Sequence, residues 1–136
     1  VKIDADRSWS LQALQNISSD ATGKTVLANA VVLNLLSVGA VRKQYVEKFA
    51  AVATLYNLTT EPGAVVPLTN TKNVVATLVH VAHNQATESD IRLLACDALA
   101  TLGLWLQTLA GAGSVPDGTQ QVPLPSYVSA GWKRWD

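Results

Sequence analysis

The sequence predicts an all-α protein built from stacked helical repeats, and three observations lead to this prediction. One six-residue pattern occurs three times, with the copies 41 and 44 positions apart. Apolar residues accompany each copy at helical spacing. Hydrophobic residues make up 49% of the chain and charged residues only 15%, against about 25% in an average soluble domain. We therefore expect extensive burial, some of it against neighbours outside this sequence.

The repeated pattern runs from Ala13 to Ser18, from Thr54 to Thr59 and from Ala98 to Gly103. A period of this length predicts that each unit buries its apolar face on the next one. The three copies are expected to lie in long helices near residues 5–18, 41–59 and 90–109.

Apolar side chains form one stripe along each expected long helix. In the third, the stripe runs from Ile91 to Leu109. Glu88, Ser89 and Asp90 provide capping groups and negative charge at its start, and Gly111 follows its expected last turn. In the second, the stripe consists of Tyr45, Phe49, Val52, Leu55 and Tyr56.

Shorter helices are predicted between the long ones. Two segments, about 21–29 and 30–38, separate the first and second copies. Two more, about 62–69 and 71–84, separate the second and third, and Pro62 suits the first turn of its helix. Each spacing thus contains a short, a medium and a long helix.

This three-helix unit resembles the armadillo repeat family over Asp4 to Ala110. The resemblance depends on the segments LQALQNISSD, AAVATLYNLTT and CDALATLG and on the apolar helix pairs between them. HEAT arrays have a similar period but two helices per unit, so the armadillo family is the closer match. The resemblance implies a right-handed armadillo-like α-solenoid, with about two full repeats plus a half unit in residues 1–110, whose long helices line a concave groove.

The composition changes at Gly111, and residues 111–136 are predicted to be an irregular tail rich in Gly and Pro. Trp132 and Trp135 lie near its end. They either fold back on the last helix or dock on a partner. Folding back is the preferred interpretation, since a terminal repeat must shield its outer face.

The same position of the first two long helices holds an asparagine, Asn16 and Asn57. The resemblance implies that this amide binds the backbone of an extended peptide, because it has both donors and an acceptor. The alternative is that each Asn bonds neighbouring backbone and maintains the repeat geometry. The predicted partner-binding residues are Gln12, Asn16, Asn57 and Thr101.

In the nuclear-import adaptors of this family, a Trp precedes that Asn by four residues, one helical turn away. Gln12, Ala53 and Asp97 occupy these positions here. The missing Trp residues argue against a receptor for nuclear-localisation signals.

Other motifs do not predict an active site. Gly23-Lys24-Thr25 lacks the earlier glycine and the strand of a phosphate-binding loop. His80 and His83 have no further ligand at a metal-binding spacing. Cys96 is expected to be a small core residue, and Arg42, Lys43 and Lys48 a solvated basic cluster. We therefore expect no enzyme, no cofactor and no metal.

Composition also restricts the partners. The net charge is zero, which argues against direct nucleic-acid binding. No apolar run reaches the roughly 18 residues of a membrane helix, and a single cysteine fits a reducing compartment, cytoplasm or nucleus. The sequence predicts a scaffold that binds a protein or peptide, or else a permanently buried segment of a large assembly, including a nuclear one; association with neighbouring repeats or with itself is a further option.

Overall fold

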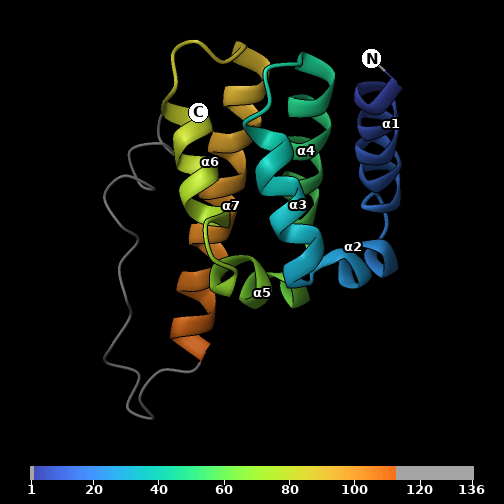
Figure 1. Ribbon diagram of the computed structural model, residues 1–136. Helices are drawn as coiled ribbons and strands as arrows, with labels where there is room; N and C mark the ends of the chain where they lie inside the picture. Colours follow the sequence, from blue (N-terminus) through green and yellow to red (C-terminus); the bar gives the residue numbers. More distant parts are fainter. Residues whose placement is uncertain (1, 113–136) are drawn as a thin grey trace.

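The computed structural model describes residues 2–112 of the chain, with side chains described from residue 7 to residue 108. Every regular element in that range is a helix (Figure 1), so the predicted all-α class is confirmed for the described residues. The elements are α1 (Lys2–Ile17), α2 (Ala21–Leu27), α3 (Ala30–Ala40), α4 (Tyr45–Thr59), the 3-10 turn η1 (Pro62–Ala64), α5 (Val65–Asn70), α6 (Val74–His83) and α7 (Ser89–Ala112).

Helices of three lengths follow one another twice along the chain. The first set, α2, α3 and α4, contains 7, 11 and 15 residues. The second set, α5, α6 and α7, contains 6, 10 and 24 residues. A further long helix of 16 residues, α1, precedes the first set. The chain thus has the order of short, medium and long helices that the sequence predicts.

The predicted boundaries were wrong at several places. Residues 41–44 connect α3 to α4 and are not part of the long helix, because the amide of Arg42 closes the end of α3 on the carbonyl of Gly39. The segment that begins at Pro62 is divided into η1 and α5. Asn73 has a left-handed φ of 76°, so α6 begins only after it. Finally, α7 continues through Gly111, because one glycine costs a helix only about 1 kcal/mol.

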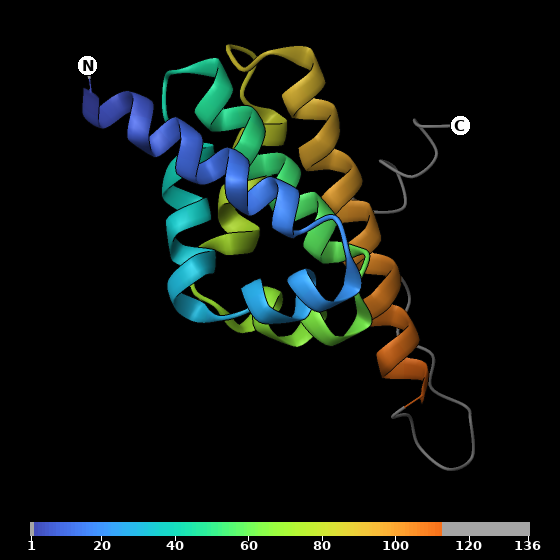
Figure 2. The ribbon, with the colours of Figure 1, turned by 90° about the vertical axis from the view of Figure 1, so that its right-hand side faces the viewer.

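The three long helices lie side by side, with α4 between α1 and α7 (Figures 1 and 2). All three run in the same direction along the chain, and α3 and α6 run in the opposite direction (Figure 1). The helix α3 packs on α4, α6 packs on α7, and α3 and α6 contact each other. The short helices α2 and α5 lie beside the C-terminal ends of α1 and α4, at the lower edge of the molecule in Figure 1.

The middle long helix, α4, forms the centre of the hydrophobic core. Val52, Leu55 and Leu58 are fully buried on it. Each such side chain contributes about 1.5–3 kcal/mol when it leaves water. A Cβ atom at Gly39 of α3 would lie only 3.1 Å from the Cβ of Ala51, so the two helices approach closely there. The core continues through Leu33, Leu36, Leu68, Leu78 and Ile91.

Acidic residues at equivalent positions precede α2 and η1, and each accepts a hydrogen bond from an amide of the following first turn. The Asp20 carboxylate accepts a hydrogen bond from the Gly23 amide at 2.7 Å at the start of α2. Glu61, 41 positions later, accepts from the Gly63 amide at the start of η1, at 3.5 Å. Side-chain caps satisfy amides that a helix leaves unpaired in its first turn. The period seen in the sequence therefore extends to the ends of the helices.

Gly23 is required by a close approach of two backbones. A Cβ atom at this position would lie 1.7 Å from the carbonyl oxygen of Ile17, at the end of α1. Lys24 donates to the Thr60 hydroxyl at 2.7 Å. The Gly-Lys-Thr sequence thus joins α2 to the ends of α1 and α4, and it lies within a helix.

Gly23→Ala should destabilise the protein by about 2 kcal/mol or more, because overpacking against backbone outweighs the better helix propensity of alanine. The matched control is Gly63→Ala, whose Cβ would have its nearest contact at 3.7 Å. We expect that control to stay within about 0.5 kcal/mol of the parent protein. Urea unfolding followed by circular dichroism measures both, and equal stabilities of the two variants would contradict the close approach.

Candidate functional site

Asn57 joins α4 to the segment that follows α1. Its Nδ2 donates to the Ser18 hydroxyl at 3.0 Å, and Ser18 in turn donates to the carbonyl of Gln15 at 2.6 Å. Ser18 is fully buried and Asn57 is half-buried. This amide therefore fixes how two adjacent long helices pack, which is the structural alternative weighed for it in the sequence.

Asn16 occupies the equivalent position of α1, 41 residues earlier, but its surroundings differ. Its side chain is exposed. Among the described residues no helix packs on the side of α1 that corresponds to the Asn57 side of α4. The same residue type at the same place of the repeat is thus a packing residue in α4 and an accessible amide in α1.

The other two predicted contacts lie on the outer long helices. Gln12 is exposed on α1, and its Nε2 donates to Ser8 at 3.3 Å, one turn earlier. Thr101 is half-buried on α7 and donates to the carbonyl of Asp97 at 2.8 Å. The four predicted residues are thus distributed over the three neighbouring long helices α1, α4 and α7.

One side of α4 is covered by neither α1, α3 nor α7, and it holds aromatic residues. Phe49 and Tyr56 are half-buried there, on either side of Ala53, which is 6% exposed. The ring of Tyr45 packs on Phe49 with centroids 5.8 Å apart, and Tyr45 is 41% exposed. The predicted apolar stripe of α4 thus includes residues on its uncovered side, because the sequence does not show which side of α4 its neighbours leave uncovered.

The adjacent helix, α7, adds acidic groups at this side. Asp90 accepts a hydrogen bond from the Tyr45 hydroxyl, and this bond raises the pKa of Tyr45. Asp97 lies two turns further along α7 and is half-buried. Its partial burial raises the pKa of Asp97, because a desolvated carboxylate is less stable than a solvated one.

We use the name long-helix face for the surface formed by Gln12 on α1, by Phe49, Ala53 and Tyr56 on α4, and by Asp97 on α7. Gln12, Ala53 and Asp97 are 41 and 44 positions apart, so they occupy equivalent positions on the three parallel helices. The face combines half-exposed aromatic rings with a small residue and a desolvated acid.

Ion pairs connect each long helix to the next unit. Arg7 on α1 donates to Glu47 of α4 at 3.4 Å, and the Glu47 side chain is only 1% exposed. Lys48 on α4 donates to Glu88, just before α7, at 2.6 Å. That bond lowers the pKa of the Glu88 carboxyl below its ordinary value. Both the cations and the acids of these two pairs are separated by 41 positions.

The remaining candidates do not gather into a reactive centre. His80 and His83 are exposed on α6, and Cys96 is half-buried on α7. Among the side chains that the structure describes, residues 7–108, no group of three or more His, Cys, Asp or Glu is placed to hold a metal ion. Arg42 and Lys43 are exposed, as predicted, whereas Lys48 forms the ion pair described above. Trp132 and Trp135 lie outside the described residues.

Comparisons with protein-family models, with curated proteins and with solved structures found no match to this chain. Within residues 2–112, no single helix has the length and hydropathy needed to cross a membrane. The helices α2 and α3 meet those requirements only when taken together, and the chain bends by 92° between them.

Asn57→Ala should lower the free energy of unfolding by about 0.5–1.5 kcal/mol more than Asn16→Ala, because only the first removes a hydrogen bond between helices. Both substitutions gain the same helix propensity, so the difference isolates that bond. Chemical unfolding of the two variants measures it. Equal effects would show that the Asn57–Ser18 contact does not stabilise the stack.

The ion pair between Lys48 and Glu88 should make stability depend on pH. Because the folded-state pKa of Glu88 is lowered, the stabilisation is present above the ordinary Glu pKa of about 4.3 and is lost as pH falls through the folded-state value. Glu88→Gln should therefore be less stable than the parent protein at neutral pH, with the difference vanishing in acid. Lys48→Met should show the same dependence of stability on pH. A stability difference that does not change with pH would show that the ion pair does not stabilise the protein.

Proposed function

We propose that this chain is a non-catalytic, armadillo-like interaction module whose long-helix face binds an extended segment of a protein partner. The helix order and the period of 41 and 44 residues support the armadillo-like interpretation. The observation that supports binding is the pair of half-exposed rings, Phe49 and Tyr56, around the small Ala53. Aromatic residues are enriched at protein interfaces. They are also common among the few interface residues that contribute most of the binding energy.

The charges of the long-helix face favour a segment with lysine or arginine side chains. Asp97 is acidic and partly desolvated, and Asp90 lies two turns away on the same helix. None of the residues that define the face is basic. A cation placed here would pair with the Asp97 carboxylate and would also contact aromatic rings, which attract cations.

Polar side chains of α1 suit the backbone of such a segment. Gln12 and Asn16 are exposed amides one helical turn apart, so they lie on one side of α1. Asn57 uses its Nδ2 on Ser18, and its Oδ1 remains to accept a backbone amide. Thr101 adds a hydroxyl on α7. The predicted contacts thus belong to this proposal as backbone-binding groups. They lie next to Phe49 and Tyr56, which the sequence predicts as members of an apolar stripe and not as partner contacts.

A second function has its own observation in favour. Trp9, Val31 and Leu35 are 69%, 73% and 56% exposed on α1 and α3. Large exposed apolar side chains are costly in a protein that remains alone in water. They support a permanently buried, architectural segment of a larger assembly, in which those surfaces are covered.

Selection from a displayed random peptide library tests the binding function. We expect the parent chain to enrich peptides with Lys or Arg. Asp97→Asn should weaken their affinity about tenfold or more, since a hydrogen bond to a charged group contributes about 1.5–3 kcal/mol. The matched control, Glu61→Gln, removes the same charge away from the face and should leave affinity unchanged.

The double variant Asn16→Ala/Asn57→Ala should also lose affinity while it stays folded by circular dichroism. Unchanged affinity in the folded double variant would exclude the backbone-binding role. If the parent chain enriched no peptide at all, the architectural function would be favoured.

A further inference from the structure

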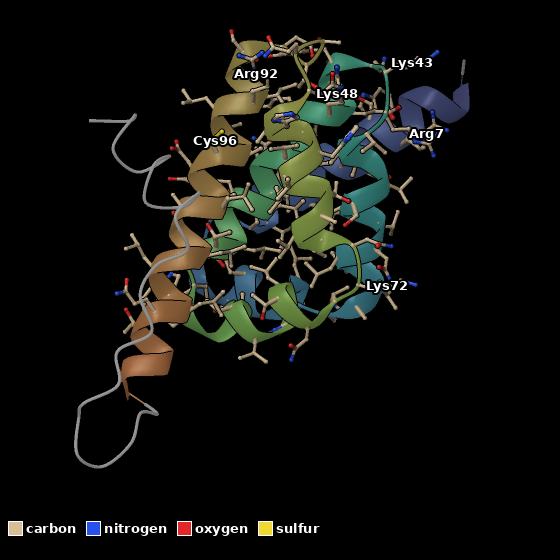
Figure 3. The ribbon with its side chains drawn as sticks, turned by 90° about the vertical axis from the view of Figure 1, so that its left-hand side faces the viewer. Arg7, Lys43, Lys48, Lys72, Arg92 and Cys96 are labelled. Carbon is tan, nitrogen blue, oxygen red and sulfur yellow. The ribbon has the colours of Figure 1, made fainter. Side chains whose placement is uncertain are left out.

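The two ends of the helix stack are the surfaces where a repeat interface is half complete. Figure 2 looks onto the first end, where α1, α2 and α3 face the viewer. Figure 3 looks onto the opposite end, formed by α6 and α7. Since α4 packs on both α1 and α7, its two sides show which residues form a complete interface. The equivalent residues at each end of the stack can then be compared with them.

The side of α4 that faces α1 is identified by its bonds to that helix. Glu47 pairs with Arg7, and Asn57 bonds Ser18. Ala50 and Thr54 lie between them at helical spacing and are 1% and 0% exposed. This stripe is therefore fully buried when a long helix packs on it.

The equivalent stripe of α1 is exposed. The positions 41 residues before Ala50, Thr54 and Leu58 hold Trp9, Ala13 and Ile17. Trp9 is 69% exposed and Ile17 is 48% exposed, and Ala13 is exposed as well. α1 thus has the packing stripe of α4, with a large aromatic residue, Trp9, at its start and no helix upon it among the described residues.

Charged residues recur at the same interface. Arg7 and Lys48 are 41 positions apart, and Arg92 follows Lys48 by 44, the step that also separates Leu58 from Leu102. The first two cations pair with Glu47 and Glu88 of the next unit. Among the described residues no acidic side chain forms an ion pair with Arg92. Asp6 lies 41 positions before Glu47, so it occupies on α1 the position that Glu47 occupies on α4.

A hollow of 770 Å³ lies beside Arg92, lined also by His83, Leu93 and Cys96. Arg92 and Cys96 lie one turn apart on α7 (Figure 3). At the two internal interfaces, the hollow beside Arg7 and Glu47 measures 530 Å³ and the hollow beside Lys48 measures 260 Å³. Both are smaller than the hollow beside Arg92, on which no further unit packs among the described residues.

We propose that copies of this chain associate head to tail, with the α1 end of one copy docked on the α7 end of the next. The two ends are the two halves of one repeat interface, and the charges at their equivalent positions, Asp6 and Arg92, are opposite. Such an interface joins two different surfaces, so it does not close at a dimer and it builds open oligomers. It involves the ends of the stack and does not depend on peptide binding by the long-helix face.

The test uses two charge reversals in the full chain, Asp6→Arg and Arg92→Glu, analysed by sedimentation velocity at increasing concentration. The parent chain should form oligomers beyond the dimer. Each variant alone should remain monomeric, because its two ends then have like charges. An equimolar mixture should associate again, since each variant restores an opposite charge for the other.

Trp9→Glu tests the apolar half of the same interface. The residue is largely exposed, so the variant should fold and yet fail to associate. Val66→Glu, at a residue 54% exposed on α5, is the matched control and should associate like the parent chain.

A monomeric parent chain at all concentrations would overturn the proposal, as would association that both charge reversals leave unchanged. If the parent chain is monomeric and Trp132→Ala/Trp135→Ala begins to associate, the chain's own C-terminal segment competes with a second copy, and the proposal is overturned for the parent chain. None of these results involves a peptide, so they are independent of the selection experiment on the long-helix face.

Discussion

The packing of α4 against α1, α3 and α7 is the constraint on which the remaining structure depends. Ala50 and Ala51 are small enough to let α1 and α3 approach closely, and Val52 and Leu55 complete the buried surface. Ion pairs then fix the height of α4 relative to α1 on one side and α7 on the other. A rotation or slip of this helix would move every one of these groups out of register, because a helix presents each residue to one side only. The long-helix face exists because one side of α4 is left uncovered.

A stack of equivalent units has a consequence for its ends. Each internal interface joins two different surfaces, and each surface occurs once more at an end, where nothing packs on it among the described residues. This explains why Trp9 is exposed in a chain whose composition is so apolar. The described residues thus form two kinds of surface. The ends of the stack expose positions that are buried at an internal interface, whereas the long-helix face combines aromatic, polar and acidic side chains. The two surfaces suit different partners for this reason.

Repeated residues do not have repeated roles. Asn57 and Asn16 occupy one position of the unit, but only Asn57 has a neighbouring helix to bond. Gly23 lies in a sequence similar to part of a phosphate-binding loop, and the structure shows that it allows two backbones to meet. In both cases the role depends on what lies opposite the residue in space. A motif restricts the chemistry that a side chain can perform, and its neighbours decide whether that chemistry is used.

The sequence by itself determined the helical class, the order of short, medium and long helices and the positions that are equivalent between units. These properties depend on apolar spacing and on capping residues such as Asp20 and Glu61, which act within a few positions of the chain. Only the tertiary structure decided that Tyr45 is exposed, that Asn57 bonds Ser18 and that Arg7 reaches Glu47. Partners about 40 residues apart meet because helices of particular lengths return to the same level of the stack. No local pattern encodes which side of a helix its neighbours will leave uncovered.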